Sequence, residues 1–256
     1  MANLLEGQRA IILGLANRWS IAAGIAQSFS REGAELILTY QSERQLKAVE
    51  DLASELGAAK LLQCDVTKED EMAGLVKELQ SDGKPLHSMV HSIAFANRED
   101  LNQPFVNTSR DGFLLAHEVS VYSLVSTARA LTPLMTEGGS VMTLSYLGAV
   151  RAIPNYNVMG VAKAALESTV RYLAAELGQS NIRVNAISAG PIKTASARAI
   201  GDLSKILDHV AQRAPLRRNT NQEEVGDTAA FLASNLSRGV TGNVIYVDSG
   251  YQATGF

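Results

Sequence analysis

Short apolar runs of strand length alternate with longer helical segments along all 256 residues. Each run is rich in apolar side chains and ends at a glycine or a polar residue, which is typical of a buried strand. Parallel strands joined by helical crossovers produce this alternation, so the sequence predicts an α/β fold. We expect one doubly wound parallel sheet of about seven strands with helices on both faces, in a single domain spanning residues 1–256. The predicted strands are residues 9–14, 35–40, 61–66, 86–92, 140–145, 181–188 and 244–250.

The composition excludes several classes of protein. A net charge of −3 argues against a general nucleic-acid-binding protein. The single cysteine, Cys64, cannot build an intrachain disulfide framework and lies in an apolar run, so we expect a buried, unreactive thiol and a reducing compartment. No stretch has the length of a membrane span, and residues 1–8 lack the apolar core of a signal peptide. We therefore expect a cytoplasmic protein with no nucleic-acid and no membrane partner.

The end of the first predicted strand has the features of a pyrophosphate site. This strand ends at Gly14, and Ser20 is a suitable N-cap for a helix that begins at Ile21. A strand, a glycine turn and a capped helix N-terminus together bind the pyrophosphate of a dinucleotide. The usual Gly-x-Gly-x-x-Gly spacing is absent, since only Gly14 and Gly24 remain. Alone, this turn is weak evidence, because many strand–helix turns contain one glycine.

The second and third predicted strands end at residues suited to an adenosine. Gln41 follows the second strand, at the position where an acidic residue favours NAD and an arginine favours NADP. Gln41 itself is neutral, and Arg44 lies three residues later. Asp65 and Val66 could bracket an adenine with a side chain and a backbone amide. Ordinary roles remain open for both places: Gln41 as a polar turn residue before a helix, and Asp65 as a cap of the next turn.

Two tyrosines and a lysine lie around the start of a long helix predicted at residues 156–177. Seven residues turn through about 700°, so Tyr156 and Lys163 share one helical face, about 10 Å apart along the axis. A phenol and an ammonium so placed could hold a reacting carbonyl and a polar cofactor, although a surface tyrosine with a solvated lysine is the ordinary alternative. His87 and His91 alternate with apolar residues, and we interpret them as core or edge histidines rather than catalysts.

Together these features resemble the short-chain dehydrogenase/reductase superfamily, whose fold is Rossmann-type. The turn Asn-Ala-Ile-Ser-Ala-Gly-Pro (185–191) and the terminal Val-Asp-Ser-Gly (247–250) carry the resemblance. Its dehydrogenases place tyrosine four residues before the lysine, where this chain has Met159. The spacing Tyr156-x6-Lys163, with Tyr146 ten residues upstream, is similar to the divergent branch, the bacterial enoyl-[acyl-carrier-protein] reductases of type II fatty acid synthesis. Further shared motifs are Gly-x5-Ser-Ile-Ala (14–22), His-Ser-Ile-Ala-Phe-Ala (91–96) and Pro-Asn-Tyr-Asn-Val-Met-Gly (154–160), so the resemblance covers essentially the whole chain.

The resemblance implies an oxidoreductase that uses NADH, with NADPH as the other option, to reduce a trans-2-enoyl chain held on acyl carrier protein. Tyr156 would donate to the thioester carbonyl, Lys163 to the nicotinamide ribose, and Tyr146 would line the acyl pocket as a second active-site tyrosine. The backbone around Ala96 would contact the substrate, and no metal is implied. The implied cofactor-binding residues are Gly14, Ser20, Ile21, Gln41, Asp65, Val66, Ile93, Lys163, Ile192, Lys193, Thr194, Ala195 and Ser196.

The resemblance also suggests how the substrate is enclosed and delivered. Residues 194–213 would form a substrate lid, with an ordinary amphipathic helix pair as the alternative. Carrier proteins are acidic, so a docking surface is one interpretation of the nearby basic residues, and a solvated charged face is the other. Family members are usually homotetramers, which we expect here too. The basic residues in question are Arg198, Lys205, Arg213, Arg217 and Arg218.

Two other functions remain to be tested. An ordinary short-chain ketoacyl or alcohol dehydrogenase would need a tyrosine in place of Met159. A non-catalytic dinucleotide-sensing module would be expected to lose the tyrosine–lysine pair, whereas this chain retains Tyr156 and Lys163.

Overall fold

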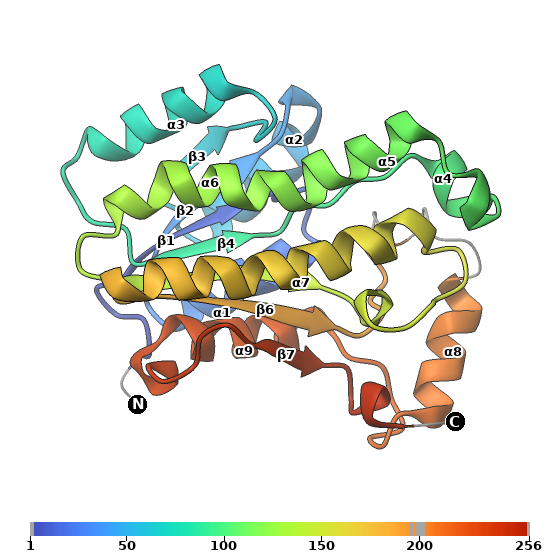
Figure 1. The fold of residues 1–256 in the computed structure, drawn as a ribbon. Coiled ribbons are helices and arrows are strands. Elements are labelled where there is room, and N and C mark those ends of the chain that lie inside the picture. The colour runs from blue at the N-terminus through green and yellow to red at the C-terminus, as the bar shows by residue number, and fades with distance from the viewer. Residues whose placement is uncertain (1–2, 195–196, 198–202, 255–256) are drawn as a thin grey trace.

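In the part of the chain that the structure describes, seven parallel strands form one sheet in the order β3-β2-β1-β4-β5-β6-β7, with helices on both of its faces (Figure 1). The computed structural model describes residues 3–194, 197 and 203–254. The parallel strand order and the helices on both faces confirm the predicted doubly wound sheet. Its chain order reverses between β1 and β4, and ligands of such sheets bind beyond the carboxyl ends at this switch point. The strands are β1 (Arg9–Leu13), β2 (Glu35–Tyr40), β3 (Lys60–Gln63), β4 (Ser88–His91), β5 (Gly139–Ser145), β6 (Ile182–Ala189) and β7 (Val244–Val247).

An apolar core forms on each face of the sheet, because successive strand residues point to opposite faces and both faces are covered. Ile12 packs with α1, α2 and α9 on one face, and its neighbour Ile11 packs with α3, α6 and α7 on the other. Within the described part of the chain, no helix combines the length and the apolar character needed to cross a membrane. The α-helices are α1 (Ile21–Arg31), α2 (Glu43–Glu55), α3 (Glu69–Gln80), α4 (Arg98–Asn102), α5 (Arg110–His117), α6 (Ser123–Leu131), α7 (Asn157–Leu177), α8 (Leu203–Arg213) and α9 (Gln222–Ala233).

Several predicted element boundaries are wrong. The third strand ends at Gln63 rather than at residue 66, because Asp65 accepts hydrogen bonds from the backbone and side chain of Thr67 and turns the chain out of the sheet. Lys68 is then the N-cap of α3. A π-helical turn, Glu118–Tyr122, lies between α5 and α6. Such turns occur mostly as bulges inside α-helices, frequently at functional sites.

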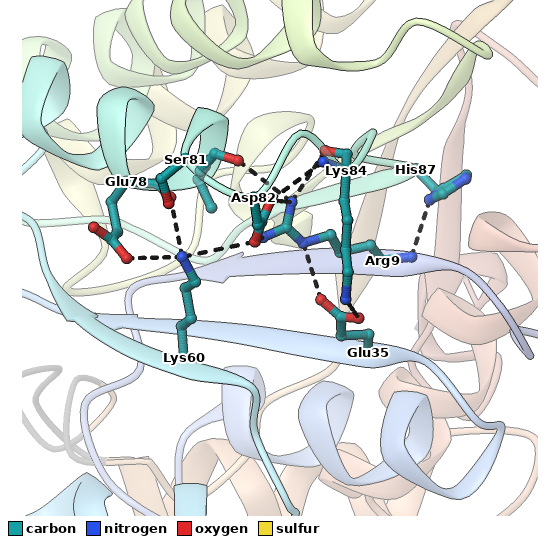
Figure 2. Close-up of polar contacts among 9 residues, drawn as sticks. Arg9, Glu35, Lys60, Glu78, Ser81, Asp82, Lys84 and His87 are labelled. Atoms are coloured by element: carbon teal, nitrogen blue, oxygen red, sulfur yellow. Dashed lines mark hydrogen bonds and ion pairs between the residues drawn. The ribbon is translucent and has the colours of Figure 1, made fainter.

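A network of ion pairs ties together the amino-terminal end of the sheet, opposite the ligand-binding end (Figure 2). Arg9 is only 3% exposed, and its Nη2 lies 2.5 Å from Asp82 while its Nη1 donates to the Lys84 carbonyl oxygen at 3.0 Å. Its Nε lies 3.1 Å from Glu35 as an ion pair, without the angle of a hydrogen bond. Lys60 and Lys84 pair with the surrounding carboxylates. The network joins β1, β2 and β3 to the segment between α3 and β4.

Candidate active site

A cavity of about 890 Å³ opens at the carboxyl ends of the strands, within the size range of cofactor and substrate sites. It brings together most of the predicted site residues. Lys193 is exposed and does not line the cavity, while Ala195 and Ser196 lie outside the described residues. The predicted residues that line it are Gly14, Ser20, Ile21, Gln41, Asp65, Val66, Ile93, Ala96, Tyr146, Tyr156, Lys163, Ile192 and Thr194.

The turn after β1 can lie against the end of β4 only because residue 14 is glycine. Gly14 has φ +89°, and a Cβ there would lie 2.5 Å from the Ser92 carbonyl oxygen at the end of β4. Ser20 caps α1, with its side chain accepting from the backbone amide of Ala23 at 3.2 Å. Gly24 has a different task, since a Cβ there would meet the backbone of Gln222 at the start of α9. One glycine therefore forms the turn, and the other allows two helices to pack closely.

The ends of β2 and β3 are joined by a side-chain hydrogen bond. Gln41 Nε2 donates to Asp65 Oδ2 at 3.1 Å, and the Thr67 side chain donates to Asp65 Oδ1 at 2.7 Å. Burial opposes ionisation of Asp65, but the hydrogen bonds from Thr67 and Gln41 outweigh it and lower the pKa of that carboxyl. A carboxylate therefore faces this end of the cavity at neutral pH. Arg44 is exposed and does not line the cavity.

Tyr156 is held inward by an unusual backbone at the start of α7. Its neighbours Asn155 and Asn157 both have positive φ, 60° and 38°. Asn157 Nδ2 donates to the carbonyl oxygens of Leu101 and Gln103, at 2.9 and 2.7 Å, which anchors this turn to the segment around α4. Asparagine tolerates the left-handed region better than most residues. These contacts direct the Tyr156 ring into the cavity, where only 8% of the residue is exposed.

The two tyrosines pack edge to face, with ring centroids 4.8 Å apart and planes inclined at 66°. Burial, aided by the nearby Tyr251, raises the pKa of Tyr146 to about 12. The pKa of Tyr156 is also raised, because burial disfavours its phenolate and Tyr146 adds to the effect. Both side chains are thus neutral phenols at neutral pH and able to donate a hydrogen bond.

Lys163 lies two turns along α7 and is buried in the same cavity. Its Nζ donates to the Leu144 carbonyl oxygen, at the end of β5, at 2.7 Å. Burial lowers the pKa of Lys163 to about 8, although the negative charge of Glu167 acts in the opposite direction. The ammonium is therefore largely retained at pH 7, but it titrates within an accessible range.

Two other titratable residues near the cavity, His91 and Cys64, are buried, and their environment keeps both uncharged at neutral pH. The His91 ring nitrogens lie 3.2 Å from Thr143 Oγ1 and 2.7 Å from Ser123 Oγ, and burial together with Lys163 lowers the pKa of His91 to about 3. This buried, hydrogen-bonded ring fits the predicted core histidine. Cys64 is buried, and its pKa is raised to about 12 by burial and then by Glu71 and Asp65. Among the described residues, no group of His, Cys, Asp or Glu could hold a metal ion.

Sequence reasoning assigned no lining role to several apolar residues. Phe95, Leu101 and Met159 all line the cavity, although they come from three separate segments; Leu203 and Ile206, which also line it, lie within the predicted lid. The Phe95 backbone is held by Ser120 from the π-helical turn, whose hydroxyl accepts from the Phe95 amide at 3.1 Å. These contacts depend on how the segments pack, and the local sequence has no signal for them.

A doubly wound sheet, a glycine turn at its switch point and a buried tyrosine–lysine pair define the class of this protein. It is an oxidoreductase of the short-chain dehydrogenase/reductase type. Residues 14–252 match the family model described as "Enoyl-(Acyl carrier protein) reductase". The chain therefore belongs to the enoyl-(acyl carrier protein) reductase family.

Individual relatives match the chain over nearly its full length. It is 54% identical to enoyl-[acyl-carrier-protein] reductase [NADH] of Bacillus cereus, covering 98% of this chain and 99% of the relative. It is 50% identical to enoyl-[acyl-carrier-protein] reductase [NADPH] of Staphylococcus aureus, covering 97% and 98%. A crystal structure of the Bacillus cereus reductase with NADP+ and indole naphthyridinone superposes with a TM-score of 0.97, at 53% identity and 99% coverage of both chains.

Proposed function

We propose that this chain reduces a trans-2-enoyl thioester on acyl carrier protein, with NADH as the electron donor. The observation that carries the proposal is the convergence of Tyr146, Tyr156 and Lys163 in one cavity that also contains the turn after β1. A binding module would not need a buried ammonium and two neutral phenols around a single space. Met159 lines the same cavity, so a ketoacyl reductase would lack its tyrosine there.

The residues present fit a dinucleotide. The turn at Gly14, next to the capped N-terminus of α1, suits a pyrophosphate, and Gly14, Ser20 and Ile21 line the cavity there. Gln41, Asp65 and Val66 would hold the adenosine, and Ile93, Ile192 and Thr194 the nicotinamide end. When bound, the reduced nicotinamide supplies a hydride for the β-carbon of the substrate.

NADH is favoured over NADPH by the charge at the adenosine end. The ionised Asp65 accepts from Gln41 there and would repel the 2′-phosphate of NADPH. Arg44, which could offset that charge, does not line the cavity. Relatives of each kind are known, since the Bacillus cereus enzyme is named for NADH and the Staphylococcus aureus enzyme for NADPH.

The protein side chains would act on the oxygen of the substrate and on its orientation. Addition of hydride to the β-carbon moves charge to the thioester oxygen, which becomes an enolate. The Tyr156 phenol, already neutral and directed into the cavity, would donate to that oxygen; one such donor contributes about 3 kcal/mol to transition-state stabilisation. Lys163 would orient the ribose hydroxyls, and Tyr146 would confine the acyl chain. Tyr156, directly or through water, would then be the source of the proton for the α-carbon.

Enclosure and delivery of the substrate complete the proposal. Residues 194–213 would act as a lid, since Leu203 and Ile206 of α8 line the cavity. Acyl carrier protein would dock on the basic residues nearby. Arg218 is already paired with Glu224 at 2.5 Å, and Arg198 lies outside the described residues. A homotetramer in the cytoplasm is the assembly and location that we propose.

A spectrophotometric assay tests the activity. Purified protein, a trans-2-enoyl thioester and either NADH or NADPH are mixed, and loss of the reduced-nicotinamide absorbance is followed. We expect NADH to be oxidised faster, and we expect Tyr156→Phe to lower kcat by about 10²-fold while cofactor affinity is retained. The matched control is Tyr172→Phe, because Tyr172 is on the same helix but 77% exposed. Wild-type kcat in Tyr156→Phe would show that the catalytic assignment is wrong.

Docking of the carrier is tested separately. Arg198 and Lys205 are replaced together by glutamate, and the Michaelis constants are measured for a carrier-protein substrate and for a coenzyme A thioester. We expect a much larger rise for the carrier-protein substrate, because only that substrate has an acidic protein surface. Equal rises for both substrates would contradict the docking surface.

A further inference from the structure

A buried carboxyl group close to the cavity has no role in the chemistry described so far. Glu167 is on α7, one turn after Lys163, and is only 6% exposed. Buried carboxylates are rare unless they are paired, because burial opposes the charged form. Its Oε1 accepts from Ser145 Oγ at 2.5 Å, and Ser145 is itself buried and lines the cavity. Glu167 therefore contacts Ser145, a residue that lines the cavity, without lining the cavity itself.

Lys163 and Glu167 hold two consecutive residues of β5. They are four positions apart on α7 and so lie on the same helical face. Lys163 Nζ donates to the Leu144 carbonyl oxygen, and Glu167 accepts from the adjacent Ser145. The next residue is Tyr146, one of the two cavity tyrosines. One turn of α7 is thereby attached to the point where β5 enters the active site.

Charged and titratable groups face this pair from several elements. The Lys163 ammonium and Arg171 favour ionisation of Glu167 from α7 itself, and Tyr246 faces it from β7. His91 faces Lys163 from β4. Burial raises the pKa of Glu167, and the Ser145 hydrogen bond opposes that rise. The negative charge of Glu167 in turn favours the ammonium form of Lys163, whose pKa burial lowers to about 8.

We propose that Glu167 is a positioning residue that holds the end of β5 through Ser145 and keeps the Lys163 ammonium charged from one helical turn away. The kinetic tests of this inference rest on the proposed function, because they measure reduction of an enoyl thioester. The carboxylate supplies two things: a fixed acceptor for Ser145, and a negative charge beside a buried cation. Glutamine can replace the acceptor but not the charge, so the two contributions can be separated.

The test compares Glu167→Gln with wild type over a range of pH. Without the carboxylate, Lys163 loses its proton at lower pH, so the alkaline decline of kcat/KM should move down by roughly one pH unit. At pH 8.5 this is a loss of up to about tenfold relative to wild type, with little change at pH 6.5. The matched control is Glu176→Gln, because Glu176 is on the same helix but exposed. Glu167→Asp, which keeps the charge, should restore much of the alkaline activity.

A second readout does not depend on catalysis. The pKa of Lys163 is measured by NMR on lysine labelled at Cε, with Lys163→Arg used to assign the signal. We expect the pKa to fall in Glu167→Gln and to change little in Ser145→Ala, which should instead lower kcat because β5 is no longer held. An unchanged Lys163 pKa in Glu167→Gln would overturn the electrostatic role, and wild-type kcat in Ser145→Ala would overturn the positioning role. If wild type reduces no enoyl thioester but the NMR shift is seen, the proposed function fails and the charge coupling stands.

Discussion

Replacing Gly148 with alanine should displace Tyr156 and so test how tightly the site must be held. A Cβ at position 148 would lie 2.4 Å from Cδ1 and 2.7 Å from Cε1 of the Tyr156 ring. Ordinary van der Waals contact begins near 3.4 Å, so the ring must move by about 1 Å. Gly148 does not have a positive φ, and the alanine backbone is therefore unstrained. The clash therefore falls on the Tyr156 ring, while Tyr146 Cδ1, at 3.4 Å from the new Cβ, is in ordinary contact.

The magnitude follows from the precision that catalysis needs. A misplacement of about 1 Å costs about 10²-fold in rate, which corresponds to about 2.7 kcal/mol of transition-state stabilisation. Overpacking should also lower the free energy of unfolding by about 1–3 kcal/mol. We expect Gly148→Ala to lower kcat/KM for the enoyl thioester by about 10²-fold, with cofactor affinity changed much less, because the nearest atoms to the new Cβ belong to the two tyrosines and not to the turn at Gly14.

The assay measures kcat/KM by reduced-nicotinamide absorbance and unfolding by urea denaturation. The matched control is Gly74→Ala on α3, where a Cβ would meet nothing within 4 Å. That variant should retain full activity and be as stable as wild type or slightly more so. A folded Gly148→Ala protein with wild-type kcat/KM would refute the reasoning, because it would mean that the position of the Tyr156 ring does not limit the rate.

Three further predictions concern charge and burial elsewhere in the chain. Arg9→Met should lower the free energy of unfolding, measured by urea denaturation, by about 3 kcal/mol, because it leaves carboxylates and carbonyls at the end of the sheet without their donor. The control is Arg18→Met: Arg18 is in an exposed pair with Glu55, so its loss should cost under about 0.5 kcal/mol. The pKa of Lys163 is lowered from 10.5 to about 8, so the ammonium present below pH 8 is lost above it, and kcat/KM should fall as pH rises through about 8; a flat profile from pH 7 to 9.5 would contradict this. Cys64 is buried and its pKa is raised to about 12, so its thiol should resist iodoacetamide at pH 7.5 in the native protein and react once urea unfolds the chain. Rapid alkylation of the native protein would show instead that the thiol is accessible.

The fold and the approximate place of the site followed from local sequence patterns. Alternating strands and helices determine a parallel sheet, and a parallel sheet collects all the strand carboxyl ends at one edge. Residues far apart in the chain, such as Gly14, Gln41 and Tyr146, could therefore be assigned to one site from the sequence alone. The seven-residue spacing of Tyr156 and Lys163 likewise determined that both lie along one side of α7.

Only the tertiary structure decided the details that depend on contacts between segments. The end of β3 was mispredicted because the side chain of Asp65, rather than the apolar run before it, turns the chain. The attachment of Glu167 to Ser145, 22 residues away, and the contact of Gly148 with Tyr156 have no local signal. Hydrophobic periodicity predicts which face of a helix or strand is buried, because that depends only on the order of apolar and polar residues within the element. Which side chains then meet across that interface depends on packing, which is set by all the elements together.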